Sequence, residues 1–281
     1  MLKARVFTAV VLLSVFVYAL FGLPPLGWAC FVTLLAALAA WEWGGLMAIS
    51  SCMRISFGVV MSLICAVLVF AFPSSMGFDA NFSGAAWGLG RYFYIPACFF
   101  WFLCVPFWMK RRWPLRKTVA GMATGMLLIL PTWLALIQLK RLGAWFLLAI
   151  MAVVWLADIG GYFFGRLLGR HKLAPAISPG KTWEGVCGGV LAVVVYGFVL
   201  QAKFPESVTL QPMLLLFSLI FLALFSVVGD LFESMLKRQA GIKDSSRLLP
   251  GHGGVLDRID SLTSVLPLVA LIWLSPFGSW L

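Results

Sequence analysis

Charged residues are scarce in this sequence, and their scarcity excludes an ordinary soluble domain. Of the 281 residues, 11% are charged and 62% are apolar, and the mean hydropathy is +1.01. A soluble domain carries about 25% charged residues, so the excess apolar surface here must face something other than water. We therefore expect an all-α fold, a polytopic integral membrane bundle of helices.

The sequence also lacks paired cysteine spacings and a small-residue cleavage site after its first apolar run. The six cysteines lie mostly inside apolar runs, without the paired spacings of zinc sites, so we interpret them as small core residues and expect no disulfide framework. They are Cys30, Cys52, Cys65, Cys98, Cys104 and Cys187. No small-residue cleavage site follows the first apolar run, Val6 to Phe21, which we interpret as a retained helix.

The apolar runs have the length of membrane spans. A helix that crosses a bilayer needs roughly 20 apolar residues, and about nine stretches qualify, with eight or ten as alternatives. The predicted spans are 5–22, 26–47, 55–73, 91–109, 118–139, 143–164, 184–202, 212–232 and 262–280. We divide the chain into an N-terminal transmembrane region, 1–140, and a C-terminal catalytic region, 141–281, whose polar loops are 165–183 and 233–261.

The basic residues predict the orientation. With a cytoplasmic N-terminus, all but four of the 21 lysines and arginines fall on the inner side, as the positive-inside rule expects. The four exceptions are Arg91, Lys140, Arg141 and Lys203. This distribution accounts for the net charge of +11 without a nucleic-acid partner. We expect a multi-pass protein of the cell inner membrane, with both long loops and the active site on the cytoplasmic side.

Three acidic residues interrupt apolar spans. They are Glu42, Asp158 and Asp230. Burying a carboxylate is costly unless it is paired, so such residues usually line a cavity. Interfacial placement is the alternative, chiefly for Glu42. All three belong to the half of the bilayer nearest the charged loops.

Five of the ten acidic residues lie between Ser226 and Asp260, among basic residues. Asp257 and Asp260 are three positions apart, so a helix places both carboxylates on one face. Together with Asp230 they would repel one another without a cation, and Mg²⁺ takes one or two carboxylates and leaves room for phosphates. We predict Asp230, Asp257 and Asp260 as metal ligands. The alternative, acidic residues that complement a helix dipole, accounts for one of them.

Two glycine-containing segments are suited to bind anions. In Ser178-Pro-Gly-Lys181-Thr182, a turn precedes a predicted helix start at Trp183, which offers backbone N–H groups and an ammonium; the spacing excludes a P-loop. His171 is interpreted as a polar loop residue or phosphate contact. His252 lies among Gly251, Gly253 and Gly254, which let the backbone approach a ligand. It either hydrogen-bonds a phosphate or leaving group or caps the turn.

These residues carry a resemblance to a known family. Ser234 to Arg238, then Lys243-Asp244, then Pro250-Gly-His-Gly-Gly-Val-Leu-Asp-Arg-Ile-Asp260 closely resemble the signature of the phosphatidate cytidylyltransferases, or CDP-diacylglycerol synthases. Ile177–Gly185 and Asp158–Arg166 resemble two further stretches of that family. The resemblance covers the C-terminal half; only hydropathy and length support the first five spans.

The resemblance implies that CTP and phosphatidate become CDP-diacylglycerol and pyrophosphate in phospholipid biosynthesis. The lipid phosphate would attack the α-phosphorus of CTP with the help of Mg²⁺, a second cation being left open. Asp230 and Asp257 match the family's metal-binding aspartates, and Asp260 is the third predicted ligand. The catalytic residues are predicted as Asp230, Asp257, Lys237 and His252. The substrate-binding residues are predicted as Ser178, Lys181, Thr182, Glu184, Arg238, Lys243, Asp244 and Arg258. Membrane lipid is an expected partner, and a homodimer is left open.

Three other functions are alternatives to a cytidylyltransferase. A secondary transporter would show paired inverted halves with broken helices near the midplane, whereas this chain concentrates its polarity on one face. A non-enzymatic scaffold would need no clustered charges beside Gly-His-Gly-Gly. A lipid-headgroup transferase would carry its aspartates on one helix with a different spacing.

Overall fold

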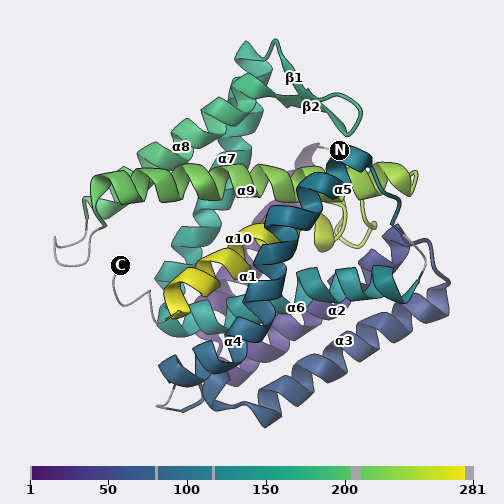
Figure 1. The fold of residues 1–281 in the computed structure, drawn as a ribbon, viewed down its shortest axis with the longest axis vertical. Helices are drawn as coiled ribbons and strands as arrows, with labels where there is room; N and C mark the ends of the chain where they lie inside the picture. The colour runs from purple at the N-terminus through teal and green to yellow at the C-terminus, as the bar shows by residue number, and fades with distance from the viewer. Residues whose placement is uncertain (1, 80–81, 116–117, 204–209, 276–281) are drawn as a thin grey trace.

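A computed structural model describes residues 2–79, 82–115, 118–203 and 210–275, and within these ranges helices form nearly all of the regular structure (Figure 1). The helices are α1 (Leu2–Gly22), α2 (Pro25–Leu46), α3 (Ser51–Ala71), η1 (Ser74–Met76), α4 (Phe82–Phe99), η2 (Phe100–Cys104), α5 (Val105–Arg111), α6 (Val119–Leu142), α7 (Ala144–Leu168), α8 (Trp183–Gln201), α9 (Pro212–Gln239) and α10 (Leu256–Leu274). The strands are β1 (Lys172–Ala174) and β2 (Ser178–Thr182).

The polytopic helical architecture is confirmed. Seven helices of the described chain are long and apolar enough to cross a membrane, including one continuous helix, Gly84–Arg111, that runs through α4, the π-helical turn η2 and α5. The first predicted span appears as a shorter apolar stretch, Phe7–Gly22. The last, α10, carries Asp257, Arg258 and Asp260 in its first two turns and is not among the seven.

The helices extend beyond the predicted spans at the polar loops. Helix α9 runs past the predicted span 212–232 to Gln239, and α10 begins at Leu256, ahead of the predicted span 262–280. Hydropathy marks where a chain becomes polar, but a helix continues as long as its backbone bonds and last-turn cations favour it. Within the predicted polar loop 233–261, residues 240–255 connect the two helices.

A short β-hairpin, which the sequence did not predict, accompanies the all-α bundle. Strands β1 and β2 pair antiparallel, with Lys172 opposite Thr182 and Ala174 opposite Ser178, at the tip of the α7–α8 helix pair (Figure 1). The predicted turn at Pro179-Gly180 lies inside β2 instead. The predicted helix start at Trp183 is confirmed, since the Thr182 hydroxyl accepts the first-turn N–H of Gly185 at 3.1 Å.

Close packing of small residues joins α7 to α8. A Cβ on Gly160 would lie 2.9 Å from the Ala192 side chain, and one on Gly189 would lie 2.5 Å from the Ala157 carbonyl oxygen. The absence of side chains at these glycines lets the two helices approach closely. This contact sets the separation of the two helices that carry the hairpin.

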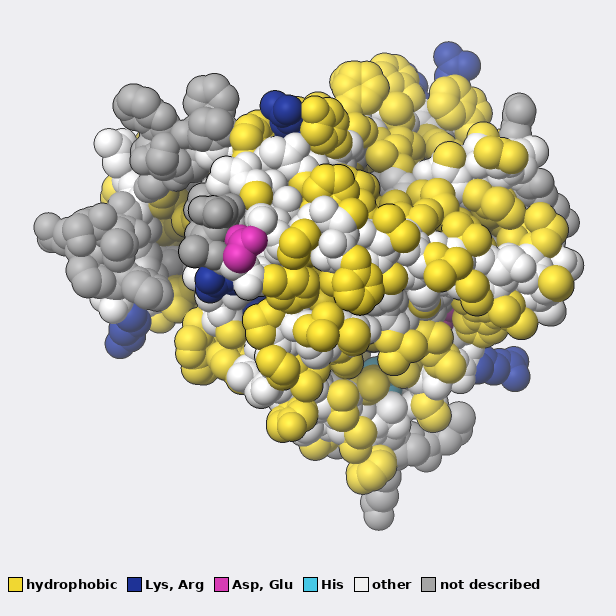
Figure 2. Space-filling view, turned by 90° about the horizontal axis from the view of Figure 1, so that it is seen from below, with side chains coloured by type: hydrophobic (Ala, Val, Ile, Leu, Met, Phe, Trp, Pro, Cys, Tyr) yellow, Lys and Arg dark blue, Asp and Glu magenta, His cyan; other side chains and the backbone are white. Residues whose placement is uncertain are grey.

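Helix α10 holds α9 against the N-terminal helices. It packs on α9, α4 and α6. The indole N–H of Trp101, in η2, donates to the Thr263 carbonyl at 2.9 Å, and its ring packs edge-on against Phe232 of α9, with centroids 5.6 Å apart. Outside this core, Figure 2 shows apolar side chains spread over the visible surface with few charges between them, as contact with lipid requires.

Candidate active site

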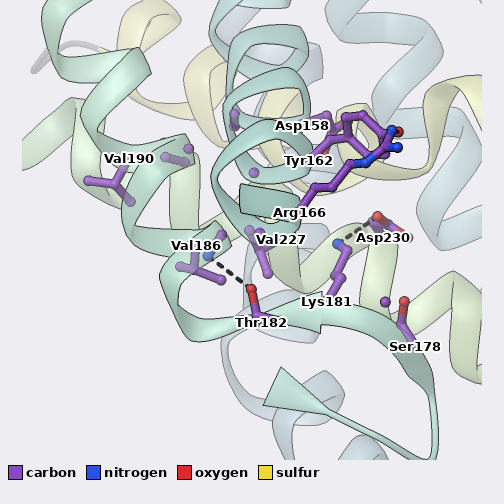
Figure 3. Close-up of a pocket in the computed structure, with 17 residues that line it drawn as sticks. Asp158, Tyr162, Arg166, Ser178, Lys181, Thr182, Val186, Val190, Val227 and Asp230 are labelled. Carbon is purple, nitrogen blue, oxygen red and sulfur yellow. Dashed lines mark hydrogen bonds and ion pairs between the residues drawn. The ribbon is translucent and has the colours of Figure 1, made fainter. Parts of the chain in front are cut away.

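A cavity of about 490 Å³ lies between α7, the hairpin, α8 and α9 (Figure 3). Its polar lining includes Asp158, Tyr162 and Arg166 of α7, Ser178, Lys181 and Thr182 at the hairpin, and Asp230 of α9. Its apolar lining includes Val186 and Val190 of α8 and Ala223 and Val227 of α9. The cavity thus joins a charged end to an apolar end.

The predicted anion-binding segment meets a predicted catalytic aspartate in this cavity. The Lys181 ammonium lies 2.6 Å from Oδ2 of Asp230, and both side chains are about a quarter exposed, at 24% and 25%. The Ser234 hydroxyl donates to the other oxygen, Oδ1, at 3.0 Å. An accessible ammonium beside a carboxylate offers one site for a phosphate and one for a cation.

Helix α7 contributes a row of polar side chains that the site prediction left out. Asp158, Tyr162 and Arg166 are spaced four residues apart and therefore share one face of the helix, which Figure 3 shows directed at the cavity. Arg166 donates to the Tyr162 hydroxyl at 2.9 Å. The i, i+4 spacing is the signal that could have revealed this row.

Asp158 and Asp230 lie on the same cavity, as expected of carboxylates within apolar spans. Asp158 is repelled by Asp230 and attracted by Lys181 and Arg258. Arg258, predicted to bind substrate, lies in the first turn of α10 and is not among the residues that line the cavity.

A second cluster of charges lies where α9 meets α10. The Lys237 ammonium is buried between the carboxylates of Glu233, at 2.6 Å, and Asp257, at 2.7 Å. The second oxygen of Asp257 accepts the backbone N–H groups of Ser245 at 2.9 Å and Gly254 at 2.7 Å. Predicted catalytic residues Lys237 and Asp257 are thus in direct contact, and Asp257 is held by hydrogen bonds on both oxygens.

Glu233 and Asp260 are the other two acidic residues of this second cluster. Their carboxyl groups interact across the α9–α10 contact, and Asp260 is also repelled by Asp230. One oxygen of Glu233 is buried without a hydrogen-bond partner. Glu233 was not predicted as a site residue; its i, i+4 spacing to Lys237 was the available signal.

The donor set of the cavity fits a hard divalent cation. In the described part of the chain, no three His, Cys, Asp or Glu side chains are arranged to hold a metal ion. The assignment of Asp230, Asp257 and Asp260 to one ion therefore stays a prediction. Asp230 and Asp158 face the open cavity, and two carboxylates with free space for phosphate oxygens and waters are the ligands that Mg²⁺ prefers.

Other predicted residues organise the hairpin and loop. Glu184 lies outside the cavity and braces the hairpin, since its Oε1 lies 2.6 Å from Nδ1 of His171 and its carboxylate accepts the His171 N–H at 3.2 Å. Arg238 donates to the Ile177 carbonyl at 3.4 Å, which ties α9 to the hairpin. Lys243 and Asp244 are exposed on the loop.

The structure is compatible with both of the roles predicted for His252. Its backbone N–H closes a turn onto the Leu249 carbonyl at 2.8 Å, whereas its side-chain Nδ1 is buried without a partner. Gly253 has a φ of +79°, and a Cβ there would lie 2.5 Å from Oδ2 of Asp257, so both backbone conformation and space require glycine beside this histidine.

Glu42 was expected to line a cavity, but it is not among the residues that line the cavity between α7, α8 and α9. Its side chain has no exposed surface. The structure buries it against the loop that precedes α10.

Comparison with known proteins assigns the chain to a family. The model of the cytidylyltransferase family matches residues 3–275. A phosphatidate cytidylyltransferase of Pseudomonas aeruginosa is 38% identical over 283 residues, covering 99% of this chain and 100% of that protein. One from Haemophilus influenzae is 34% identical and covers 95% of this chain and 96% of its own length. This chain therefore belongs to the cytidylyltransferase family.

Proposed function

We propose that this protein is a phosphatidate cytidylyltransferase, which converts CTP and phosphatidate to CDP-diacylglycerol and pyrophosphate. The observation that carries the proposal is the two-ended cavity between α7, α8 and α9. A lipid phosphate and a nucleotide triphosphate need cationic and hydrogen-bonding groups, whereas the acyl chains of the lipid need an apolar path, and one cavity offers both.

The polar end is the proposed meeting place of the phosphates. Lys181, Arg166 and the Ser178 hydroxyl line it and supply donors to phosphate oxygens. The valines of α8 and α9 would contact the lipid tail near its glycerol backbone. This arrangement admits CTP from water and phosphatidate from the leaflet if the hairpin lies on the cytoplasmic side of the inner membrane, as the basic residues predict.

The chemistry requires positioning more than a strong base. An oxygen of the lipid phosphate, already anionic, forms a bond to the α-phosphorus of CTP, while the bond to the bridging oxygen of the β-phosphate breaks and pyrophosphate leaves. Mg²⁺, when bound, neutralises phosphate charge. Lys181 and Arg166 keep two repelling anions together, which is the main requirement in phosphoryl-type transfer.

We propose that Asp230 and Asp158 hold the cation, and that the pairing of Lys237 with Asp257 fixes α9, which lines the cavity, against α10. Asp230 contacts both Lys181 and Ser234, so its position is set from two elements. Asp257 is held by Lys237 and by the loop before α10, which fixes the first turn of α10 against α9.

The test is conversion by the purified protein in detergent. With labelled CTP, phosphatidate and Mg²⁺, the expected product chromatographs as CDP-diacylglycerol, with pyrophosphate released in equal amount. Addition of EDTA should stop the reaction and excess Mg²⁺ should restore it. A purified, monodisperse protein that forms no such product would contradict the proposal, and substrate-dependent ion flux in vesicles would favour the transporter instead.

A further inference from the structure

Glu42 is an acidic residue of α2 that the proposed reaction does not use. Its side chain has no exposed surface, and none of the salt bridges among the described residues includes it. Four hydrogen-bond donors surround its carboxylate in place of a positively charged partner. Oε1 accepts the Ser246 hydroxyl at 2.6 Å and the Val255 N–H at 2.9 Å, while Oε2 accepts the Leu256 N–H at 2.6 Å and faces the Ser245 hydroxyl at 3.0 Å.

This carboxylate caps a helix more than two hundred residues away in the chain. Val255, the N-cap residue of α10, makes no side-chain cap of its own. The first N–H groups of a helix lack partners within the helix, and they carry the positive end of its dipole. Glu42 satisfies two of them, at Val255 and Leu256, from α2.

Ser245, one of the residues that contact Glu42, also contacts Asp257, which is predicted to be catalytic. The Ser245 hydroxyl lies 3.0 Å from Oε2 of Glu42 and 2.9 Å from Oδ2 of Asp257, so it sits between the two carboxylates. Gly254 makes room for this arrangement, because a Cβ there would overlap both Ser245 and Glu42. The segment 245–256, which comprises the end of the loop and the first residue of α10, therefore contacts Glu42 on one side and Asp257 on the other. It is called the loop 245–256 below.

We propose that Glu42 is a positioning residue through which the N-terminal helices set the loop 245–256 and the orientation of Asp257. The proposal rests on the proposed function only in taking Asp257 as catalytic. It gives the N-terminal region a role in the reaction beyond surrounding the site with apolar helices.

Glu42→Gln is the informative substitution. Gln keeps the size of Glu but has one oxygen, so whichever way it is placed its amide N–H₂ faces one backbone N–H of Val255 or Leu256. Loss of a hydrogen bond to a charged group changes an equilibrium by roughly tenfold or more. We expect amide hydrogen exchange in 245–256 to accelerate at least about tenfold, and kcat with saturating CTP and phosphatidate to fall by a similar factor.

Gln138→Leu is the matched control. Gln138 is also fully buried, and it accepts the Tyr94 hydroxyl at 2.7 Å and donates to the Ser75 carbonyl at 3.0 Å, within the N-terminal helices. Compared at temperatures equally far below their melting points, this variant should keep the kcat and the exchange rate of 245–256. Unchanged exchange in Glu42→Gln, or an equal loss of kcat in Gln138→Leu, would overturn the proposal.

Ser246→Ala covers the case in which Glu42→Gln does not fold. It removes one partly exposed donor to Glu42, so a smaller change in the same direction is expected, and none at all would count against the proposal. Hydrogen exchange needs no substrate. If the wild-type protein makes no CDP-diacylglycerol, the proposed function fails, while the exchange data still decide whether Glu42 fixes the loop.

Discussion

Lys237 connects the two helices that carry most of the predicted catalytic residues. Its side chain is 11% exposed, and its ammonium contacts Glu233 on its own helix and Asp257 on α10. Removing one partner of a buried ion pair leaves an uncompensated charge and costs about 3–5 kcal/mol, far more than a surface pair. At the residue scale, this pair makes the α9–α10 contact specific.

Asp257→Asn should lower turnover sharply while the protein still inserts and purifies, because Lys237 keeps Glu233 as its partner. The amide would turn an N–H₂ group toward Lys237 or toward the N–H groups of Ser245 and Gly254, where only acceptors fit. A fall in kcat of roughly a hundredfold or more is expected, measured with labelled CTP in detergent. Asp79→Asn, at an exposed aspartate outside the site, is the control and should behave as wild type. Full activity of Asp257→Asn would remove Asp257 from the mechanism.

Lys181→Met should weaken use of CTP more than it weakens the fold. It removes the ammonium that pairs with Asp230 and faces the cavity. Hydrogen bonds to charged groups contribute about 1.5–3 kcal/mol, so kcat/KM for CTP should fall roughly 10- to 150-fold. The matched control is Lys172→Met, an exposed lysine of the other hairpin strand. Equal losses in the two variants would show a general charge effect instead of a site at Lys181.

At the scale of elements, the α7–α8 pair and its hairpin form the wall of the cavity. The helices approach closely because Gly160, Gly188 and Gly189 lack side chains at their contact. The hairpin that they carry is braced by Glu184 and His171 and joined to α9 through Arg238. The position of Lys181 opposite Asp230 therefore depends on helix packing several turns away.

Gly189→Ala should destabilise the protein even though it improves helix propensity. The added methyl would lie 2.5 Å from the Ala157 carbonyl oxygen, a backbone atom that cannot move without α7. Overpacking of this kind costs about 1–3 kcal/mol and should lower the melting temperature in detergent. Gly88→Ala in α4, where a Cβ meets nothing within 4 Å, should leave it unchanged or raise it. Two identical melting curves would show that α7 and α8 adjust freely.

At the scale of the whole molecule, polar connections far apart in sequence gather at one end of the bundle. Gln239 at the end of α9 donates to the carbonyls of Arg112 and Trp113, after α5, at 3.1 and 2.9 Å. The hairpin and the loop before α10 reach the same end through Arg238 and Glu42. This gathering accords with the prediction that these connections share one side of the membrane.

Labelling of single cysteines should decide the orientation. In a cysteine-free background, Lys172→Cys, in β1, should react with an impermeant maleimide only after the membrane is opened. Lys203→Cys, which follows α8, should react in intact cells, because the positive-inside rule places it outside. The reverse pattern would place the proposed site on the outer face and rule out access of cytosolic CTP.

The resemblance of the C-terminal half already identified the family and the reaction, and hydropathy alone established a polytopic helical protein. Both depend on local properties of the chain, namely apolar run length and residue spacing. The helix ends were less predictable, because α9 and α10 continue into polar residues where backbone hydrogen bonds still favour the helix. The hairpin was missed because Pro179 and Gly180 favour a turn in isolation.

Only the tertiary structure decided which charges meet. Spacing along the chain placed Asp257 and Asp260 on one helix face, but it could not show Lys237 between Glu233 and Asp257, or Lys181 beside Asp230. Nor could it show that Glu42 caps α10, since that contact spans 214 residues. Such pairs depend on how helices pack against one another, and a carboxylate in an apolar span has the same local sequence whether it faces a cavity or a helix end.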